Sequence, residues 1–142
     1  MGCAFHRASE AYLGLEQGPI HQGRMRDHRR GQGDQVHRLQ RVPQGIADNL
    51  ERLEDREQKY PLICHAEENA IMHAARIGVS LKGCVAYVTW PPCTGCSRSL
   101  IQAGIVEVVY PADIEIPERW EKDFAMSVAM MEEAGITVRP TN

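Results

Sequence analysis

From residue 43 onwards, the apolar residues follow two spacings, one typical of helices and one typical of strands. Apolar residues three or four positions apart predict one face of a helix, made of Ala70, Ile71, Ala74 and Ile77. Gly78 is the expected end of this helix. Runs rich in β-branched and aromatic residues predict strands between the helices. The expected elements are an exposed helix or loop at 48–59, helices at 66–77, 93–103 and 117–134, and strands at 85–90, 105–110 and 136–139.

The last predicted helix carries an apolar stripe made of Trp120, Phe124, Val128 and Met131. A stripe at helical spacing is expected to pack in the core rather than to contact a cofactor. Helices that alternate with strands through short links predict an α/β domain, with parallel pairing among the later strands.

Residues 1–41 differ from the rest of the chain. They are rich in Gly, Gln, His and Arg, and they show neither strand alternation nor a sustained helical stripe. Residues 1–42 contain seven Lys and Arg against four Asp and Glu, whereas the following residues contain nine against fifteen. This change of charge predicts a boundary between an atypical segment, 1–41, and a folded domain, 42–142.

The composition limits the possible partners and location. A chain of 142 residues fits one domain, and a net charge of −3 gives no basic surface field for nucleic acid. The sequence has neither an apolar run of membrane-span length nor a signal-peptide pattern at its start. Five Cys, an odd number that includes a C-x-x-C pair, indicate a reducing compartment, so a cytoplasmic location is expected.

Two short motifs carry the candidate chemistry: His65-Ala66-Glu67 and, later in the chain, Pro92-Cys93-Thr94-Gly95-Cys96. Together they supply three zinc ligands, His65, Cys93 and Cys96, and one carboxylate, Glu67, that is not needed as a ligand. A catalytic zinc keeps one coordination position for water, whereas a structural zinc is closed by four protein ligands. The pattern H-x-E…P-C-x-x-C is typical of zinc-dependent nucleoside and nucleobase deaminases.

Each residue type has a chemical reason to be present. Zinc lowers the pKa of a bound water towards neutrality, which supplies hydroxide without a strong base. Glu67 can then take a proton from the water, protonate the ring nitrogen and help ammonia to leave. Cys93 at the start of a helix is also favourable, because free helix amides stabilise a thiolate.

The cysteines allow two simpler interpretations. Cys93 and Cys96 alone could form a redox pair, which would not require the upstream His-Ala-Glu, or half of a structural zinc site. A structural site needs a fourth ligand, for which Cys64 and Cys84 are candidates. We expect Cys64 to point away from the ion because it adjoins His65, and Cys84 to be a core residue because it lies in an apolar strand pattern.

From about Val42 to the C-terminus, the chain resembles the deoxycytidylate (dCMP) deaminases of the cytidine deaminase superfamily. The resemblance rests on three motifs, HAEENAI at 65–71, YVTWPPCTGC at 87–96 and IQAGIVEVVYP at 101–111. It implies a three-layer α-β-α fold with a mixed sheet of five strands, a zinc cofactor, and hydrolytic deamination of dCMP to dUMP. It also implies a small pyrimidine nucleotide as partner and a homo-oligomer.

The same resemblance assigns the site residues. His65, Cys93 and Cys96 match the zinc ligands, and Glu67 matches the proton shuttle. The backbone around Ala66 matches the segment that approaches the pyrimidine carbonyl, and Pro92 lies in the neighbouring segment. The alternatives that remain open are a zinc-stabilised interaction module without activity, and a deaminase that acts on another nucleoside or on a nucleic-acid base.

Residues 1–41 depart from the family, which carries a W-S-K-D-P-S-T-K-V-G type motif and a later T-G-Y-N-G motif whose Asn contacts substrate. With permitted codons, a reading frame shifted by one nucleotide through 15–27 and 27–41 recovers both motifs. We therefore infer that 1–41 is an out-of-frame translation that ends near Arg41–Val42; the alternatives are a divergent or disordered basic tail and a basic arm for nucleic acid. The expected consequences of the frameshift are first elements of the sheet that are absent or replaced, poor solubility, and weak or no activity. The coding DNA across Leu15–Pro43 tests this hypothesis.

Overall fold

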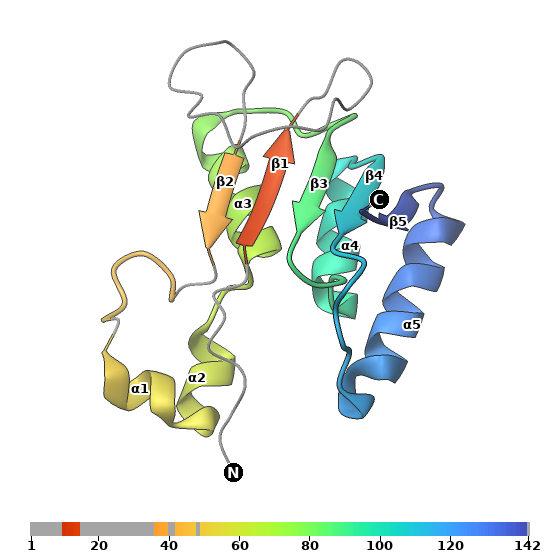
Figure 1. The fold of residues 1–142 in the computed structure, drawn as a ribbon. Helices are drawn as coiled ribbons and strands as arrows, with labels where there is room; N and C mark the ends of the chain where they lie inside the picture. Colours follow the sequence, from red (N-terminus) through yellow and green to blue (C-terminus); the bar gives the residue numbers. More distant parts are fainter. Residues whose placement is uncertain (1–9, 15–35, 40–41, 48, 142) are drawn as a thin grey trace.

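The computed structural model describes residues 10–14, 36–39, 42–47 and 49–141, and Figure 1 shows them as a five-stranded sheet accompanied by helices. In chain order the elements are β1 (Glu10–Gly14), β2 (Val36–Leu39), α1 (Leu50–Glu54), α2 (Arg56–Leu62), α3 (Ala66–Ile77), β3 (Val85–Val88), α4 (Thr94–Ala103), β4 (Glu107–Tyr110), α5 (Glu118–Glu133) and β5 (Thr137–Pro140).

The sheet is mixed, with the strand order β2-β1-β3-β4-β5. β1 pairs antiparallel with both β2 and β3, whereas β3, β4 and β5 are parallel. The helices α4 and α5 are the crossover connections that parallel neighbours require. The predicted α/β class and the predicted parallel pairing of the later strands are therefore confirmed.

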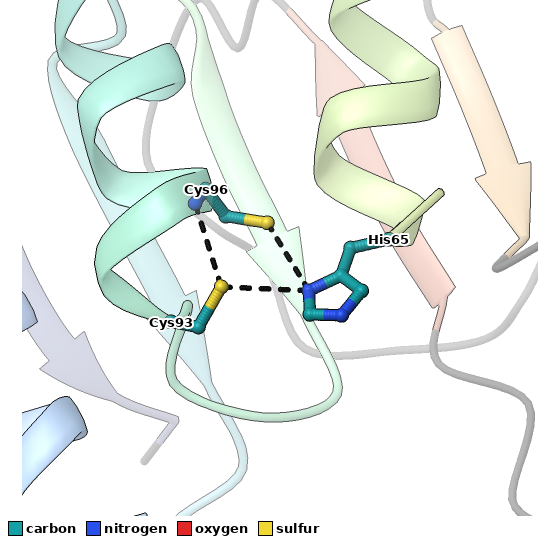
Figure 2. A group of neighbouring side chains, drawn as sticks. All are labelled: His65, Cys93 and Cys96. Atoms are coloured by element: carbon teal, nitrogen blue, oxygen red, sulfur yellow. Dashed lines mark hydrogen bonds between the residues drawn. The ribbon is translucent and has the colours of Figure 1, made fainter. Parts of the chain in front are cut away.

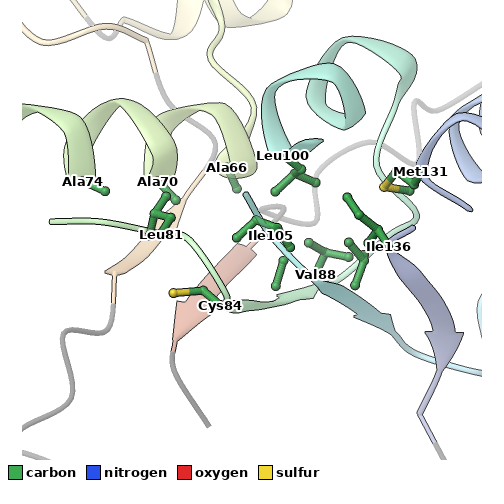
Figure 3. Close-up of a cluster of buried hydrophobic side chains, with 12 residues drawn as sticks. Ala66, Ala70, Ala74, Leu81, Cys84, Val88, Leu100, Ile105, Met131 and Ile136 are labelled. Carbon is green, nitrogen blue, oxygen red and sulfur yellow. The ribbon is translucent and has the colours of Figure 1, made fainter. Parts of the chain in front are cut away.

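One hydrophobic core joins the sheet to the three long helices. The strand register places Ala86 beside Val108 and Val108 beside Val138, so these residues share one face. Figure 3 shows side chains from α3, α4 and α5 meeting over this face, among them Leu100 and Met131, which are fully buried. The three helices thus form one layer. In the described part of the chain no helix covers the opposite face, and the third layer stays a prediction.

The N-terminal region differs from the expectation at two places. Residues 10–14 and 36–39 form β1 and β2, although their sequences show no strand alternation. A strand edge offers backbone N–H and C=O groups that any extended segment can pair with, so pairing at the edge of β3 does not require an apolar pattern. Residues 1–9, 15–35 and 40–41 lie outside the described residues, as does most of the segment inferred to be out of frame.

Most predicted elements agree with the structure to within one or two residues, and two details differ. Ile77 is exposed, so the apolar face of α3 ends earlier than the spacing suggested. On α5 the fully buried position between Phe124 and Met131 is Ser127, whereas Val128 is half-buried. Within the described residues, no helix is long and apolar enough to cross a membrane.

Gly104, which ends α4, is a position where only glycine fits well. Its φ is +80°, and an added Cβ would lie 3.2 Å from the Cα of Lys82. Gly78 ends α3 with a φ of +76°, but there an added Cβ meets nothing within 4 Å. We expect Gly78→Ala to lower the free energy of unfolding by about 1–2 kcal/mol, the left-handed penalty alone. Gly104→Ala should lower it further, because the backbone of Lys82 must also move.

Urea denaturation of both variants measures this difference. Gly78→Ala is the matched control, since it makes the same substitution at the same helix position without the close approach. Equal losses in the two variants would show that the contact with Lys82 costs nothing.

Candidate metal centre

Two helices bring the three predicted zinc ligands together. His65 is the N-cap residue of α3, and Cys93 is the N-cap residue of α4, with Cys96 in the first turn of that helix. Both N-cap residues have extended backbone angles, which is the usual conformation at a helix start. Because α3 and α4 pack beside each other on one face of the sheet, their N-terminal ends meet (Figure 1).

The ligand atoms are close enough to hold one ion. The Nδ1 atom of His65 lies 3.4 Å from the Sγ of Cys93 and 3.4 Å from the Sγ of Cys96 (Figure 2). A tetrahedral zinc with ordinary bond lengths separates a nitrogen ligand from a sulfur ligand by about 3.5 Å. All three ligand atoms lie within 4.8 Å of one another. The donor set and its spacing therefore fit zinc.

The cysteines weighed as a fourth ligand are not part of this group. Among the described residues, the candidate ligand cluster contains His65, Cys93 and Cys96. Cys84 is 1% exposed within the core, as its apolar surroundings predicted. Three protein ligands leave one coordination position open, which is the arrangement of a catalytic zinc rather than of a structural one.

Glu67 lies beside the cluster and is almost fully buried. Its Oε2 atom accepts a hydrogen bond from the Sγ of Cys96 at 3.7 Å, and the residue is 7% exposed. Burial raises the pKa of this carboxyl above its usual value. A carboxyl whose pKa is raised towards neutrality can both accept and return a proton, which is the property that acid–base catalysis requires.

The thiols and the imidazole influence one another in the metal-free protein. Hydrogen bonding from Cys96 lowers the pKa of the Cys93 thiol, and the same interaction raises the pKa of Cys96. The hydrogen bond with Cys93 raises the pKa of His65. The backbone N–H of Cys96 also points at the Sγ of Cys93, at 3.5 Å. Cys93 is therefore the group that carries negative charge most readily before an ion binds.

A cavity of about 600 Å³ opens between α3 and α4 next to the three ligands. Its wall includes all three of them, together with apolar side chains such as Ile71 and Met72 and the polar side chains of Glu68 and Arg98. Glu67 is not among the residues that line it, and this side chain is buried. Ala66 and Pro92, the two residues expected near the substrate, are also buried.

The segment Pro92–Thr94 is held from outside by α5, which the sequence did not indicate. The Ser127 hydroxyl donates to the Pro92 carbonyl at 2.5 Å, and it lies 2.5 Å from the Ser97 hydroxyl. The Asp123 carboxylate accepts from the Thr94 N–H at 3.1 Å and from the Thr94 hydroxyl at 2.8 Å. The sequence feature that could have indicated this contact is a polar residue, Ser127, next to the apolar stripe of α5.

Comparisons with known proteins agree with this site. Residues 47–112 match the family profile of the cytidine and deoxycytidylate deaminase zinc-binding region. An uncharacterised deaminase from the luxG 3′ region of Aliivibrio fischeri is 39% identical over 97 residues, which cover 68% of this chain and 63% of that protein. Deoxycytidylate deaminase of Mus musculus is 42% identical over 77 residues, covering 51% of this chain and 42% of that protein.

The fold is similar to that of a solved deaminase. The crystal structure of dCMP deaminase from the cyanophage S-TIM5, in complex with dCMP and dUMP, matches with a TM-score of 0.66 at 22% identity. The match covers 96% of this chain and 82% of that chain. The chain spans less than two thirds of the length of the two curated relatives described above. The profile match identifies residues 47–112 as the zinc-binding region of the cytidine and deoxycytidylate deaminases, the relatives agree with this family, and the phage structure shows a similar fold.

Proposed function

We propose that this protein deaminates dCMP to dUMP by hydrolysis, with zinc held by His65, Cys93 and Cys96. The observation that carries the proposal is the pairing of an open three-ligand site with a buried carboxyl, Glu67, next to it. A structural site would not need that carboxyl, and burying it costs stability. The names of the relatives and the ligands in the phage structure support dCMP as the substrate.

The residues divide the chemistry between them. When bound, zinc would supply hydroxide near neutral pH by lowering the pKa of a water molecule. Glu67 would accept one proton from that water and deliver it to the ring nitrogen next to the attacked carbon. It would then take the second proton from the added oxygen and pass it to the amine, which leaves as ammonia when its bond to the ring carbon breaks. The N–H of Ala66, in the first turn of α3, is a free donor in the helix pattern and would hold the pyrimidine carbonyl.

Two helix termini provide the electrostatic setting. The N-terminal ends of α3 and α4 both face the ligand cluster (Figure 2). Partial positive charge at these ends favours thiolates and hydroxide over their protonated forms. We therefore expect both cysteines to bind zinc without their protons, although the pKa of Cys96 is raised in the metal-free protein.

Ammonia release from the zinc-loaded chain tests the function. We expect release from dCMP, a smaller rate with cytidine or deoxycytidine, and none after zinc is removed. The rate with dCMP should lie below that of the mouse relative, because 1–41 lacks the substrate-contacting Asn that the family motif supplies. Zinc binding without turnover of any pyrimidine substrate would favour an interaction module, and preference for single-stranded nucleic acid would favour a base deaminase.

Four described cysteines are free thiols, including the two candidate ligands, and free thiols persist in reducing compartments. We propose a cytoplasmic location on this basis. We also propose a homo-oligomer, as the family resemblance implies, and size-exclusion chromatography with light scattering would measure the mass in solution.

A further inference from the structure

The two cysteine ligands depend on a short segment that α5 holds in place. Cys93 follows Pro92 directly, and Cys96 lies in the first turn after it, so the direction of the Pro92–Thr94 backbone sets where both sulfur atoms lie. Proline has no N–H, and the Pro92 carbonyl is buried with the rest of the residue. Its hydrogen bond from the Ser127 hydroxyl, at 2.5 Å, comes from a helix more than thirty residues later in the chain.

Ser97 links this contact to α4. The Cys93 carbonyl accepts both the backbone N–H and the hydroxyl of Ser97, each at 2.9 Å. The Ser97 hydroxyl also lies 2.5 Å from the Ser127 hydroxyl, which donates to the Pro92 carbonyl. Both serines are 0% exposed, so water does not reach these groups and each proton must come from the protein.

Asp123 makes a second contact one helical turn away. Residues 123 and 127 lie on the same side of α5, since positions four apart share one helix face. The Asp123 carboxylate accepts two hydrogen bonds from Thr94, one from its N–H and one from its hydroxyl. α5 thus makes hydrogen bonds to the residues on both sides of Cys93, namely to Pro92 before it and to Thr94 after it.

We propose that Asp123 and Ser127 are positioning residues of the metal centre, which fix the sulfur atoms of Cys93 and Cys96 relative to the Nδ1 of His65. Neither residue is a ligand, and neither lines the cavity beside the ligands. They act through the backbone of the segment that carries the thiols. The inference rests on the proposed zinc site, but not on the choice of dCMP as substrate.

Metal binding by single variants of the full chain tests this inference. Ser127→Ala removes the donor to Pro92, Asp123→Ala removes both acceptors for Thr94, and Asp123→Asn keeps one acceptor oxygen. We expect the zinc Kd, measured by competition with a chelator, to rise about 10- to 100-fold for the two alanine variants, as is usual when a partner of a metal ligand is lost. Asp123→Asn should give a smaller rise. The absorption bands of the Co²⁺-loaded alanine variants should shift, because the ligand geometry changes.

Two controls separate positioning from general destabilisation. Met131→Leu changes a fully buried residue on the same helix and should lower stability without moving the Co²⁺ bands. Glu121→Gln removes an exposed carboxylate from α5 and should change neither measurement. If the alanine variants lose stability like Met131→Leu while their zinc Kd and Co²⁺ bands stay as in the wild type, the inference is wrong. Failure of the wild type to bind zinc would overturn the proposed site and this inference together, whereas zinc binding without deamination would overturn the proposed reaction alone.

Discussion

Glu67→Gln is expected to abolish turnover while zinc stays bound. Gln has nearly the same shape as Glu but cannot take up and return a proton, and general acid–base catalysis contributes about 10²–10⁴-fold to a rate. Glu67 is assigned several proton transfers, so the fall in kcat should lie in the upper part of that range. The carboxyl is outside the ligand cluster. One equivalent of zinc should therefore remain in the purified variant, as measured by metal analysis.

The stability of the same variant gives an independent check. Burial raises the pKa of Glu67, which means that the folded protein disfavours its ionised form. Such a carboxyl lowers the free energy of unfolding more and more as the pH rises above the pKa that the group has in the unfolded chain. Removing the charge should therefore leave the melting temperature unchanged or raise it slightly at neutral pH. Loss of zinc or a large loss of stability would show that Glu67 has a structural role instead.

Glu118→Gln is the matched control for this substitution. Glu118 occupies the first turn of α5, as Glu67 occupies the first turn of α3, but it is exposed and far from the ligands in sequence. Both variants replace one carboxyl near a helix N-terminus with a neutral amide. Only Glu67→Gln should lose activity. An equal loss in both variants would point to a general effect of charge.

The sequence predicted helices and strands well where the spacing of apolar residues and the residues that end an element, such as Gly, agree. The helix predicted at 66–77 is α3, and Gly78 ends it in the left-handed conformation. The ligand motifs were also recognisable, since the residue types needed for zinc chemistry lie at the starts of two predicted helices. Their proximity was expected from the chemistry, since all three ligands must reach one ion.

Other features depend on tertiary contacts that a local pattern does not reveal. β1 forms through backbone pairing with β3, and β2 through pairing with β1, which leaves little trace in the side chains of an irregular sequence. Ser127 is a polar residue in an apolar stripe, and its partners Pro92 and Ser97 are about thirty residues away. A single sequence shows that the serine is present, but it does not show which groups form hydrogen bonds with it.

Loss of one zinc ligand is expected to have the second large effect. Structural zinc sites bind with about 10–16 kcal/mol over four ligands, so removing one ligand should cost on the order of 3–4 kcal/mol, or roughly 10²–10³-fold in Kd. Cys93→Ser and His65→Ala should therefore be purified with little zinc and should not release ammonia from dCMP. Chelation of the wild type should reproduce the loss of activity and lower the melting temperature, since a ligand that binds the folded state stabilises it.

Cys84→Ala separates the ligand role from the loss of a thiol. Cys84 is buried in the core and lies outside the ligand cluster, so its replacement should cost some stability and leave the zinc content at one equivalent. Added zinc should restore activity to the chelated wild type but not to Cys93→Ser, because only the former still has three donors. Zinc loss in Cys84→Ala with retention in Cys93→Ser would mean that the ion is bound elsewhere, and it would contradict the assignment of His65, Cys93 and Cys96.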